Sequence, residues 1–481
     1  MNVNATHPDY DAALPIWLRA RDVMAGEDAV KSGGEKYLPR LEAQTDEEYA
    51  AYLARGTFFN AAGRTADGFV GLLFRRDPTV RVPDPTTGLG SALSGFLNDA
   101  DMAGMTFASY ARAVVREVLV VGRAGSLVDW DGEGEHRAFV TLCKAEDILN
   151  WRVERVGGRN VLTLLVLHEW VRVAGGDVYE TKLGEQVRVL RLGVDGCQVE
   201  VWRPGPDDGR RRDWVMVESR TPLRLGRPLP LIPFVFHGTS HCLPDVDRLP
   251  LGDVITVNLD HFRLNADYRH GMHFTALPTA WVCGFDKSST LRIGSSTAWV
   301  TETPGATAGF LEFRGDGLET FERAMDRDER LMAILGARML ESEKRTAETQ
   351  AAIELRMTGE HSVLGALAGA VSVGLTNVLR WVYWWNSTEA RPEDLTGGAV
   401  TFALNVDYSV RGLTSADMNA VVQAWQNGAL SQDTMLDIFR RGEVIAPGRT
   451  NEQEARLIAL AGGGGNLDVA RQRPAGEPQL P

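Results

Sequence analysis

The sequence predicts an α+β protein built from several structural units. Apolar residues recur at helical spacing over most of the first 125 residues, and short β-branched segments follow over residues 126–236. Two long helical segments then enclose a compact insert. A chain of 481 residues also exceeds one typical hydrophobic core, so we expect roughly two to four units.

The first region, residues 8–125, is expected to be helical. Pro15 suits a first helical turn, because its missing N–H would have no partner there. Thr45 and Glu48 have the spacing of a capping box, which marks the start of another helix. We expect a loop over residues 80–90 and then a further helix.

That further helix is predicted over residues 107–125, with Gly122 and Gly125 ending it. Residues 126–236 then form short alternating segments separated by turns such as "DGEGE", "VGGRN" and "GVDG". The pattern predicts a meander of antiparallel strands.

From Leu249 the helical period returns. We expect helices over residues 246–275 and 314–341, with a small strand-and-turn insert at 276–313 between them. The second helix has an apolar stripe that only Asp328 interrupts.

Four arginines of this helix fall within about a quarter turn of one another: Arg323, Arg327, Arg330 and Arg338. Glu319 precedes the first of them by four residues, in the favourable orientation for a helix pair. The face is open to three interpretations: it is solvated, it faces a polyanion, or it pairs with acids of a neighbouring subunit.

A charged segment, "LESEKRTAETQ" (340–350), follows the second helix. It lacks the Gly, Pro and Asn of an ordinary tight turn. After it we expect one long helix to about Asn386 and a strand within residues 349–412. Short helices over 413–462, joined at Asn427–Gly428, and a disordered Gly-rich tail at 463–481 complete the chain.

Composition limits the class of protein. The net charge of −13 and the pI near 5.3 argue against a broad surface that grips phosphate backbones. The four widely spaced cysteines indicate reduced core residues, and the N-terminus lacks the pattern of a signal peptide. Residues 363–379 are uncharged, and we favour a helix buried in a protein assembly over a membrane span.

The sequence carries no motif of nucleotide hydrolysis, nucleophilic catalysis or zinc proteolysis. His270 and His273 lie close together, with His261 upstream, but no cysteine or carboxylate cluster completes a metal site. His168 and Glu169 are neighbours on a predicted strand, so they point to opposite faces. We therefore expect no catalytic residues, no metal and no cofactor.

Six stretches carry a resemblance to a known family: "PIWLRARDVMAGEDAVKSGGEKYLPRL", "EEYAAYLARGTFFNAAGRTADGFVGLLFRRDP", "KAEDILNWRVE", "LPLIPFVFHG", "LGDVITVNLDHFRLNADYRHGMHFTALPTAWVCG" and "MAILGARMLESEKRTAET". In this order, they resemble the portal proteins (head-to-tail connectors) of tailed bacteriophages. The resemblance covers the chain from about Pro8 to residue 460. It is closest to a subgroup long described only as a domain of unknown function.

The resemblance implies a ring, generally a dodecamer, at one capsid vertex. Under it, residues 1–245 and 349–412 form a wing, 246–275 and 314–341 a two-helix stem, 276–313 a clip, and 413–462 a crown. The uncharged 363–379 helix would then be buried between subunits.

The resemblance also implies a tunnel loop at residues 342–348 that projects into a channel for double-stranded viral DNA. Its constriction residues would be Glu341, Glu343, Lys344, Arg345 and Glu348. In the clip, Asp286, Lys287 and Arg292 are the candidate docking residues.

The implied partners are the terminase large subunit, head-completion or adaptor proteins, and the major capsid and scaffolding proteins, with no membrane. The implied location is the virion, after assembly in the host cytoplasm. Another ring-forming head–tail protein and a membrane-inserted pore are the alternatives.

Overall fold

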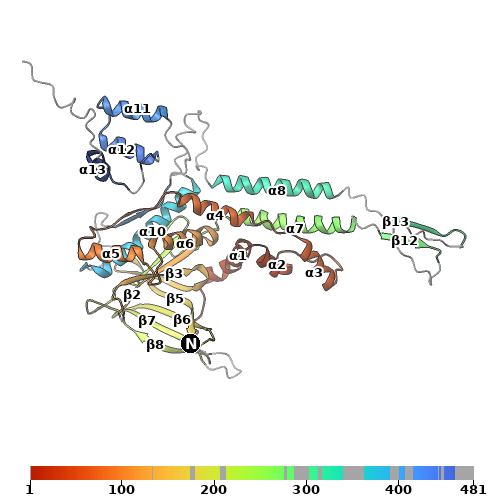
Figure 1. Cartoon of the computed structure of the whole chain (residues 1–481). Helices are drawn as coiled ribbons and strands as arrows, with labels where there is room; N and C mark the ends of the chain where they lie inside the picture. The colour runs from red at the N-terminus through yellow and green to blue at the C-terminus, as the bar shows by residue number, and fades with distance from the viewer. Residues whose placement is uncertain are drawn as a thin grey trace, which may run out of the picture.

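The computed structural model describes residues 2–132, 134–173, 179–205, 213–275, 279–285, 303–311, 317–339, 362–389, 400–406, 415–442, 444–445 and 449–460. A body of helices and two main sheets carries a projecting pair of long helices, and a two-stranded hairpin lies beyond their far end (Figure 1). The α+β class predicted from the sequence is confirmed.

The N-terminal region is mostly helical, as expected, and comprises α1 (Pro8–Ala25), α2 (Glu27–Ser32), η1 (Gly34–Lys36), α3 (Asp46–Arg55), α4 (Ala61–Leu73), α5 (Gly88–Asn98) and α6 (Phe107–Val121). The capping box of α3 is confirmed, because the Thr45 and Glu48 side chains each accept from the other's backbone N–H. The expectation for Pro15 is wrong. Helix α1 begins at Pro8, after the His7 cap, and Pro15 lies inside the helix.

Two further boundaries differ from the prediction. Helix α6 ends at Gly122, whose φ of 75° suits glycine, whereas Gly125 already lies in strand β2. The predicted loop at 80–90 contains strand β1 (Thr79–Arg81) and the start of α5. Strand β1 pairs with β14 (Thr401–Ala403), a partner too distant in sequence for local patterns to indicate.

The predicted meander is antiparallel throughout, but it divides between two sheets. The first has the order β11-β2-β3 and consists of β11 (Phe234–Gly238), β2 (Arg123–Trp130) and β3 (Ala138–Lys144). The second runs β4-β5-β6-β7-β8 and consists of β4 (Ile148–Val156), β5 (Arg159–Val173), β6 (Lys182–Gly193), β7 (Gly196–Pro204) and β8 (Trp214–Arg220). A short pair, β9 (Leu223–Arg224) with β10 (Arg227–Pro228), precedes β11. Only the second sheet is a simple meander.

Helix α10 (Val363–Asn386) lies in the core of the body and packs against β11, β14 and the β2–β3 pair. It is long and apolar enough to cross a membrane, yet 61% of its most apolar window is buried by the chain itself. The expected burial between subunits is therefore corrected: most of the covering comes from the same subunit. The predicted continuous helix from residue 349 is also wrong, since Ser362 has an extended backbone and caps α10.

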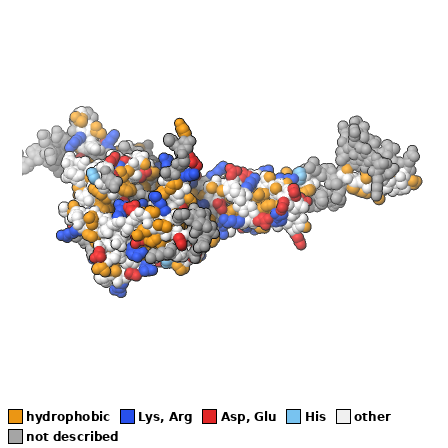
Figure 2. Space-filling model, turned by 90° about the horizontal axis from the view of Figure 1, so that it is seen from below, with side chains coloured by type: hydrophobic (Ala, Val, Ile, Leu, Met, Phe, Trp, Pro, Cys, Tyr) orange, Lys and Arg blue, Asp and Glu red, His pale blue; other side chains and the backbone are white. Residues whose placement is uncertain are grey.

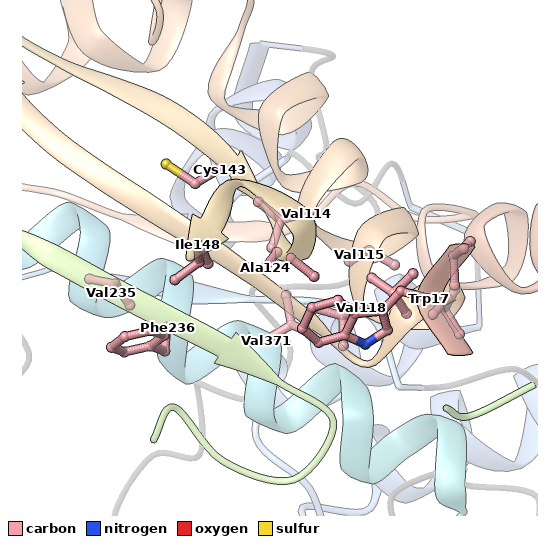
Figure 3. Close-up of a cluster of buried hydrophobic side chains, with 14 of the residues drawn as sticks. Trp17, Val114, Val115, Val118, Ala124, Cys143, Ile148, Val235, Phe236 and Val371 are labelled. Carbon is pink, nitrogen blue, oxygen red and sulfur yellow. The ribbon is translucent and has the colours of Figure 1, made fainter. Parts of the chain in front are cut away.

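The main core joins α1, α6, α10 and the three-stranded sheet (Figure 3). Trp17, Val118, Phe236 and Val371 come from four of these elements and are buried together. The tryptophans at the end of α10 are buried as well, which confirms that they are packing residues: Trp381, Trp384 and Trp385. Of the four free cysteines, Cys283 is exposed, so the expectation of four core thiols is wrong there.

Three short helices form a separate small cluster near the C-terminus: α11 (Ser415–Gln426), α12 (Gln432–Arg441) and α13 (Asn451–Leu460). The predicted break between the first two is confirmed at Gly428, which has a φ of 77°. The buried apolar residues of this cluster are Met435 and Leu436 of α12, and Ile445, which follows that helix. The predicted tail at 463–481 lies outside the described residues.

Helix α10 approaches β11 closely at one glycine. A Cβ atom on Gly374 would overlap Nδ1 of His237, and its next neighbour would be the Cys242 sulfur. His237 is buried, and its Nε2 lies 2.6 Å from Oγ of Ser126. Burial lowers the pKa of His237 to about 3.

We expect Gly374→Ala to lower the free energy of unfolding by about 1–3 kcal/mol, because the methyl group must displace a buried side chain. The matched control is Gly369→Ala on the same helix, where nothing lies within 4 Å. There alanine should be neutral or stabilising by about 0.5–1 kcal/mol through its helix propensity. Chemical denaturation measures both, and equal effects would contradict the close approach.

The free energy of unfolding should fall below about pH 6.5, where His237 binds a proton in the unfolded chain but not in the fold. Because the folded pKa is about 3, the loss should continue to that pH. At pH 5 it should reach about 2 kcal/mol. Unfolding curves at pH 7 and pH 5 measure the difference, and His237→Gln should reduce it by this amount. If His237→Gln has the same pH dependence as the unaltered chain, His237 is protonated in the folded protein at pH 5.

Candidate functional site

The feature that distinguishes this molecule is its projecting stem, which consists of α7 (Gly252–Thr275) and α8 (Leu318–Arg338). The two helices lie antiparallel, and the hairpin of β12 (Thr279–Cys283) and β13 (Thr307–Leu311) lies beyond them (Figure 1). The two long helices predicted from the sequence are thus present, each a few residues shorter than expected.

Two asparagines fasten α7 to the body. The buried side chain of Asn258 accepts from the backbone N–H of Ala62 at 3.0 Å and donates to the carbonyl of Phe59 at 2.7 Å. Asn265 accepts from the backbone N–H of Thr57 at 2.9 Å. Both thereby satisfy backbone groups around the start of α4, which would be costly to bury without partners.

Further contacts join α7 to α3 and its surroundings. Tyr52 donates to the Asp267 carboxylate at 2.5 Å, and Arg263 donates to the Tyr37 carbonyl at 2.9 Å. Burial and the bond to Asp267 raise the pKa of Tyr52. These anchors were not predicted from the sequence. The available signal was a polar residue at a core-phase position of the helix, which Asn258 and Asn265 share with Asp328.

Polar contacts also set how α8 lies along α7. Tyr268 donates to the Glu322 carboxylate at 2.6 Å, and Nε2 of His261 lies 3.4 Å from the Glu329 carboxylate. A Cβ on Gly271 would be 3.0 Å from Leu318, so the helices approach closely near the far end.

Asp328 lies on the buried side of α8, as its position in the apolar stripe predicted. It is 5% exposed, and burial raises the pKa of its carboxyl while the neighbouring Arg327 opposes the rise. The guanidinium of Arg327 is 3.7 Å away. A carboxylate in this position requires such a neighbour, because burying an unpaired charge is costly.

The predicted arginine face is exposed. Arg323 pairs with Glu319 at 2.5 Å, which confirms the expected helix pair. The side chains of Arg323 and Arg327 are 74% and 80% exposed, and Arg330 is exposed as well. Arg338 ends α8, but its side chain lies outside the described part of the structure. Basic and acidic side chains both line the visible side of the stem (Figure 2).

At the far end, the antiparallel hairpin confirms a strand-and-turn insert. Trp281 lies opposite Gly309 and is 45% exposed, so the hairpin presents an aromatic surface. The clip candidates Asp286, Lys287 and Arg292 lie outside the described residues.

The tunnel-loop candidates lie outside the described residues as well: Glu341, Glu343, Lys344, Arg345 and Glu348. The chain on either side of them meets at one point, since Leu364 donates its backbone N–H to the Met339 carbonyl at 2.9 Å. Met339 and Leu364, which are described residues on either side, therefore lie together where α8 reaches the body.

The histidines do not gather into a metal site. His261 contacts Glu329, whereas His270 lies 3.4 Å from the Arg55 guanidinium, and burial lowers the pKa of its imidazole. No group of three His, Cys, Asp or Glu residues suited to a metal occurs in the described part of the chain. His168 and Glu169 have separate partners, Glu185 and Arg188, as their opposite orientation predicted.

Comparison with solved structures finds particles called gene transfer agents (GTA). The neck of an empty GTA particle, computed with C6 symmetry, is 13% identical over 82% of this chain and 91% of that chain. A native GTA virion is 12% identical over 85% and 98% of the two chains. The neck of a native particle, computed with C12 symmetry, is 12% identical over 82% and 94%. The TM-score is 0.37 in each case.

No curated protein matches the sequence. A family model described as "Domain of unknown function (DUF4055)" matches residues 250–386. The matched residues include the stem helices, the hairpin and α10. The match spans the stem and the core helix, and it agrees with the resemblance to a domain of unknown function.

Proposed function

We propose that this chain is the subunit of a phage portal, a ring that forms a channel for double-stranded DNA at the capsid vertex. DNA would pass through it during packaging and ejection. The observation that carries the proposal is the stem, a pair of long antiparallel helices with a small hairpin at its far end. The sequence resemblance assigns the same segments to the stem and clip of portals.

The stem has the dimensions of a wall element. At about 1.5 Å per residue, the 24 residues of α7 extend about 36 Å. Met272, Phe274 and Ile334 are at least 42% exposed along the pair, which is unfavourable for a lone subunit. Cyclic packing of many copies would cover such residues and give each subunit identical neighbours.

The charge of the chain suits passage of a polyanion. Dense cationic rings would hold phosphates through counterion release, whereas a net charge of −13 avoids strong retention. In this proposal Lys344 and Arg345, set among glutamates, supply a limited contact with DNA at the constriction.

The far end of the stem is the proposed docking site for the terminase motor and, later, for head-completion and tail proteins. The exposed Trp281 is suited to an interface, because aromatic residues are enriched there. In this scheme the chain has a structural role, and the motor supplies ATP hydrolysis. A membrane-inserted pore is disfavoured, because α10 would have to leave a core in which 61% of its apolar window is buried.

Purified chain should form closed rings with a central opening. Electron microscopy of negatively stained protein and sedimentation velocity together measure this. Only monomers without an opening, at every salt and protein concentration that supports folding, would refute the portal proposal.

Replacing both Lys344 and Arg345 by alanine should reduce DNA packaging or retention severalfold, because two cations per subunit are removed from the constriction. Thermal stability and ring formation should stay the same. Encapsidated DNA per particle is the measurement, and the joint replacement of Arg152 and Arg155 by alanine, on the exposed part of β4, is the charge-matched control. Normal DNA content would remove the functional meaning of the tunnel loop.

A further inference from the structure

The outer side of α8 combines charge with exposed apolar residues. Arg323, Arg327, Arg330, Leu331 and Ile334 share this side, which we call the basic edge. By the helical period it points away from α7, whereas Glu322 and Glu329 point toward α7. Leu331 and Ile334 are 36% and 50% exposed.

A complementary surface lies on α7. Asp253 and Asp260 are exposed, and Val257 and Leu264 lie half-buried on the same side. We call these four residues the acidic face. By the helical period it lies between the residues that contact α3 and those that contact α8, on the side opposite the buried residues of α7. Asp260 already pairs with Arg263 at 2.8 Å, and its side chain is still 51% exposed.

The spacing of the charges is the same on both helices. Asp253, Asp260 and Asp267 recur every seven residues, as Arg323 and Arg330 do, which is about 10.5 Å along a helix. Because the helices are antiparallel, the contacts of Tyr268 with Glu322 and of His261 with Glu329 fix their relative height.

This register brings Asp260 to the height of Arg330, and Asp267 to that of Arg323. Within one subunit these residues occupy different sides of the stem. Rotation about an axis parallel to the stem does not change the height of a residue. In a ring around such an axis, the basic edge of one copy would therefore meet the acidic face of the next at matching heights.

We propose that the basic edge of α8 docks on the acidic face of α7 in the next copy of this chain, with Arg330 opposite Asp260. The inference rests on the proposed ring and specifies its stem contact. The contact is heterologous, since different surfaces meet, and such contacts form a ring when the rotation between copies closes. Arg323 would lie at the height of Asp267, whose carboxylate also accepts from Tyr52 of its own subunit. The apolar residues beside the charges would be buried.

A nucleic acid fits the basic edge less well. Helix α8 contains five acidic and four basic residues, so it is not a cationic helix overall. Phosphates also need no apolar contact, whereas Leu331 and Ile334 lie among the arginines. A protein surface that offers both carboxylates and apolar side chains accounts for both features.

The test uses Asp260→Arg and Arg330→Asp in the full chain, with ring formation measured by sedimentation velocity and electron microscopy. Each variant alone places like charges at every contact, so the protein concentration needed for rings should rise roughly tenfold or more. Mixing the two variants should restore rings. In an alternating ring each contact joins either the two unaltered residues or the two substituted ones, and both pairs carry opposite charges. Glu154→Arg on β4, away from the stem, is the charge-reversal control and should leave ring formation unchanged.

The outcomes separate this inference from the portal proposal. If the unaltered chain forms rings and both variants form them equally well, the stem contact is wrong and the portal proposal stands. Variants that lose rings and do not recover on mixing would also overturn the contact. If Arg330→Asp keeps its rings but loses affinity for a duplex DNA probe, the basic edge binds a polyanion instead. If the unaltered chain forms no rings, the portal proposal itself fails.

Discussion

The attachment of α7 to the start of α4 determines how the stem projects from the body. The side chains of Asn258 and Asn265 form hydrogen bonds with three backbone groups of that segment, two N–H groups and one carbonyl. An apolar residue in place of Asn258 would leave the buried backbone N–H of Ala62 without its partner, at a cost of about 1–3 kcal/mol. Apolar packing alone would let α7 slide or rotate, whereas these directional bonds select one position.

The position of α8 follows from that of α7. Tyr268 and His261 of α7 contact Glu322 and Glu329 of α8. The height at which Arg330 lies is therefore fixed by contacts inside the subunit. If copies assemble around the stem, the register between neighbours is inherited from this internal register and does not have to be encoded separately.

Local patterns in the sequence predicted most helices and strands, because burial on one side imposes its period directly. The capping box of Thr45 with Glu48 and the helix break at Gly428 were also predicted, because each depends on neighbouring residues alone. The division into two sheets and the pairing of β1 with β14 depend on contacts between distant segments, which no periodicity records. The predicted helix start at Pro15 was wrong, because proline is common in a first helical turn but lies inside helix α1 in this chain.

Helix α10 shows the limit of such patterns. An uncharged segment indicates that water is excluded, but the same segment fits a core, a subunit interface or a membrane. In the structure, strands β2, β3, β11 and β14 of the same chain cover much of it, so α10 has little apolar surface left for neighbours. A ring of these subunits must then draw its contacts from other surfaces. Along the stem, these are charged edges with a few exposed apolar residues. An acidic chain that forms rings in this way would depend on the placement of individual charges more than on a large apolar interface.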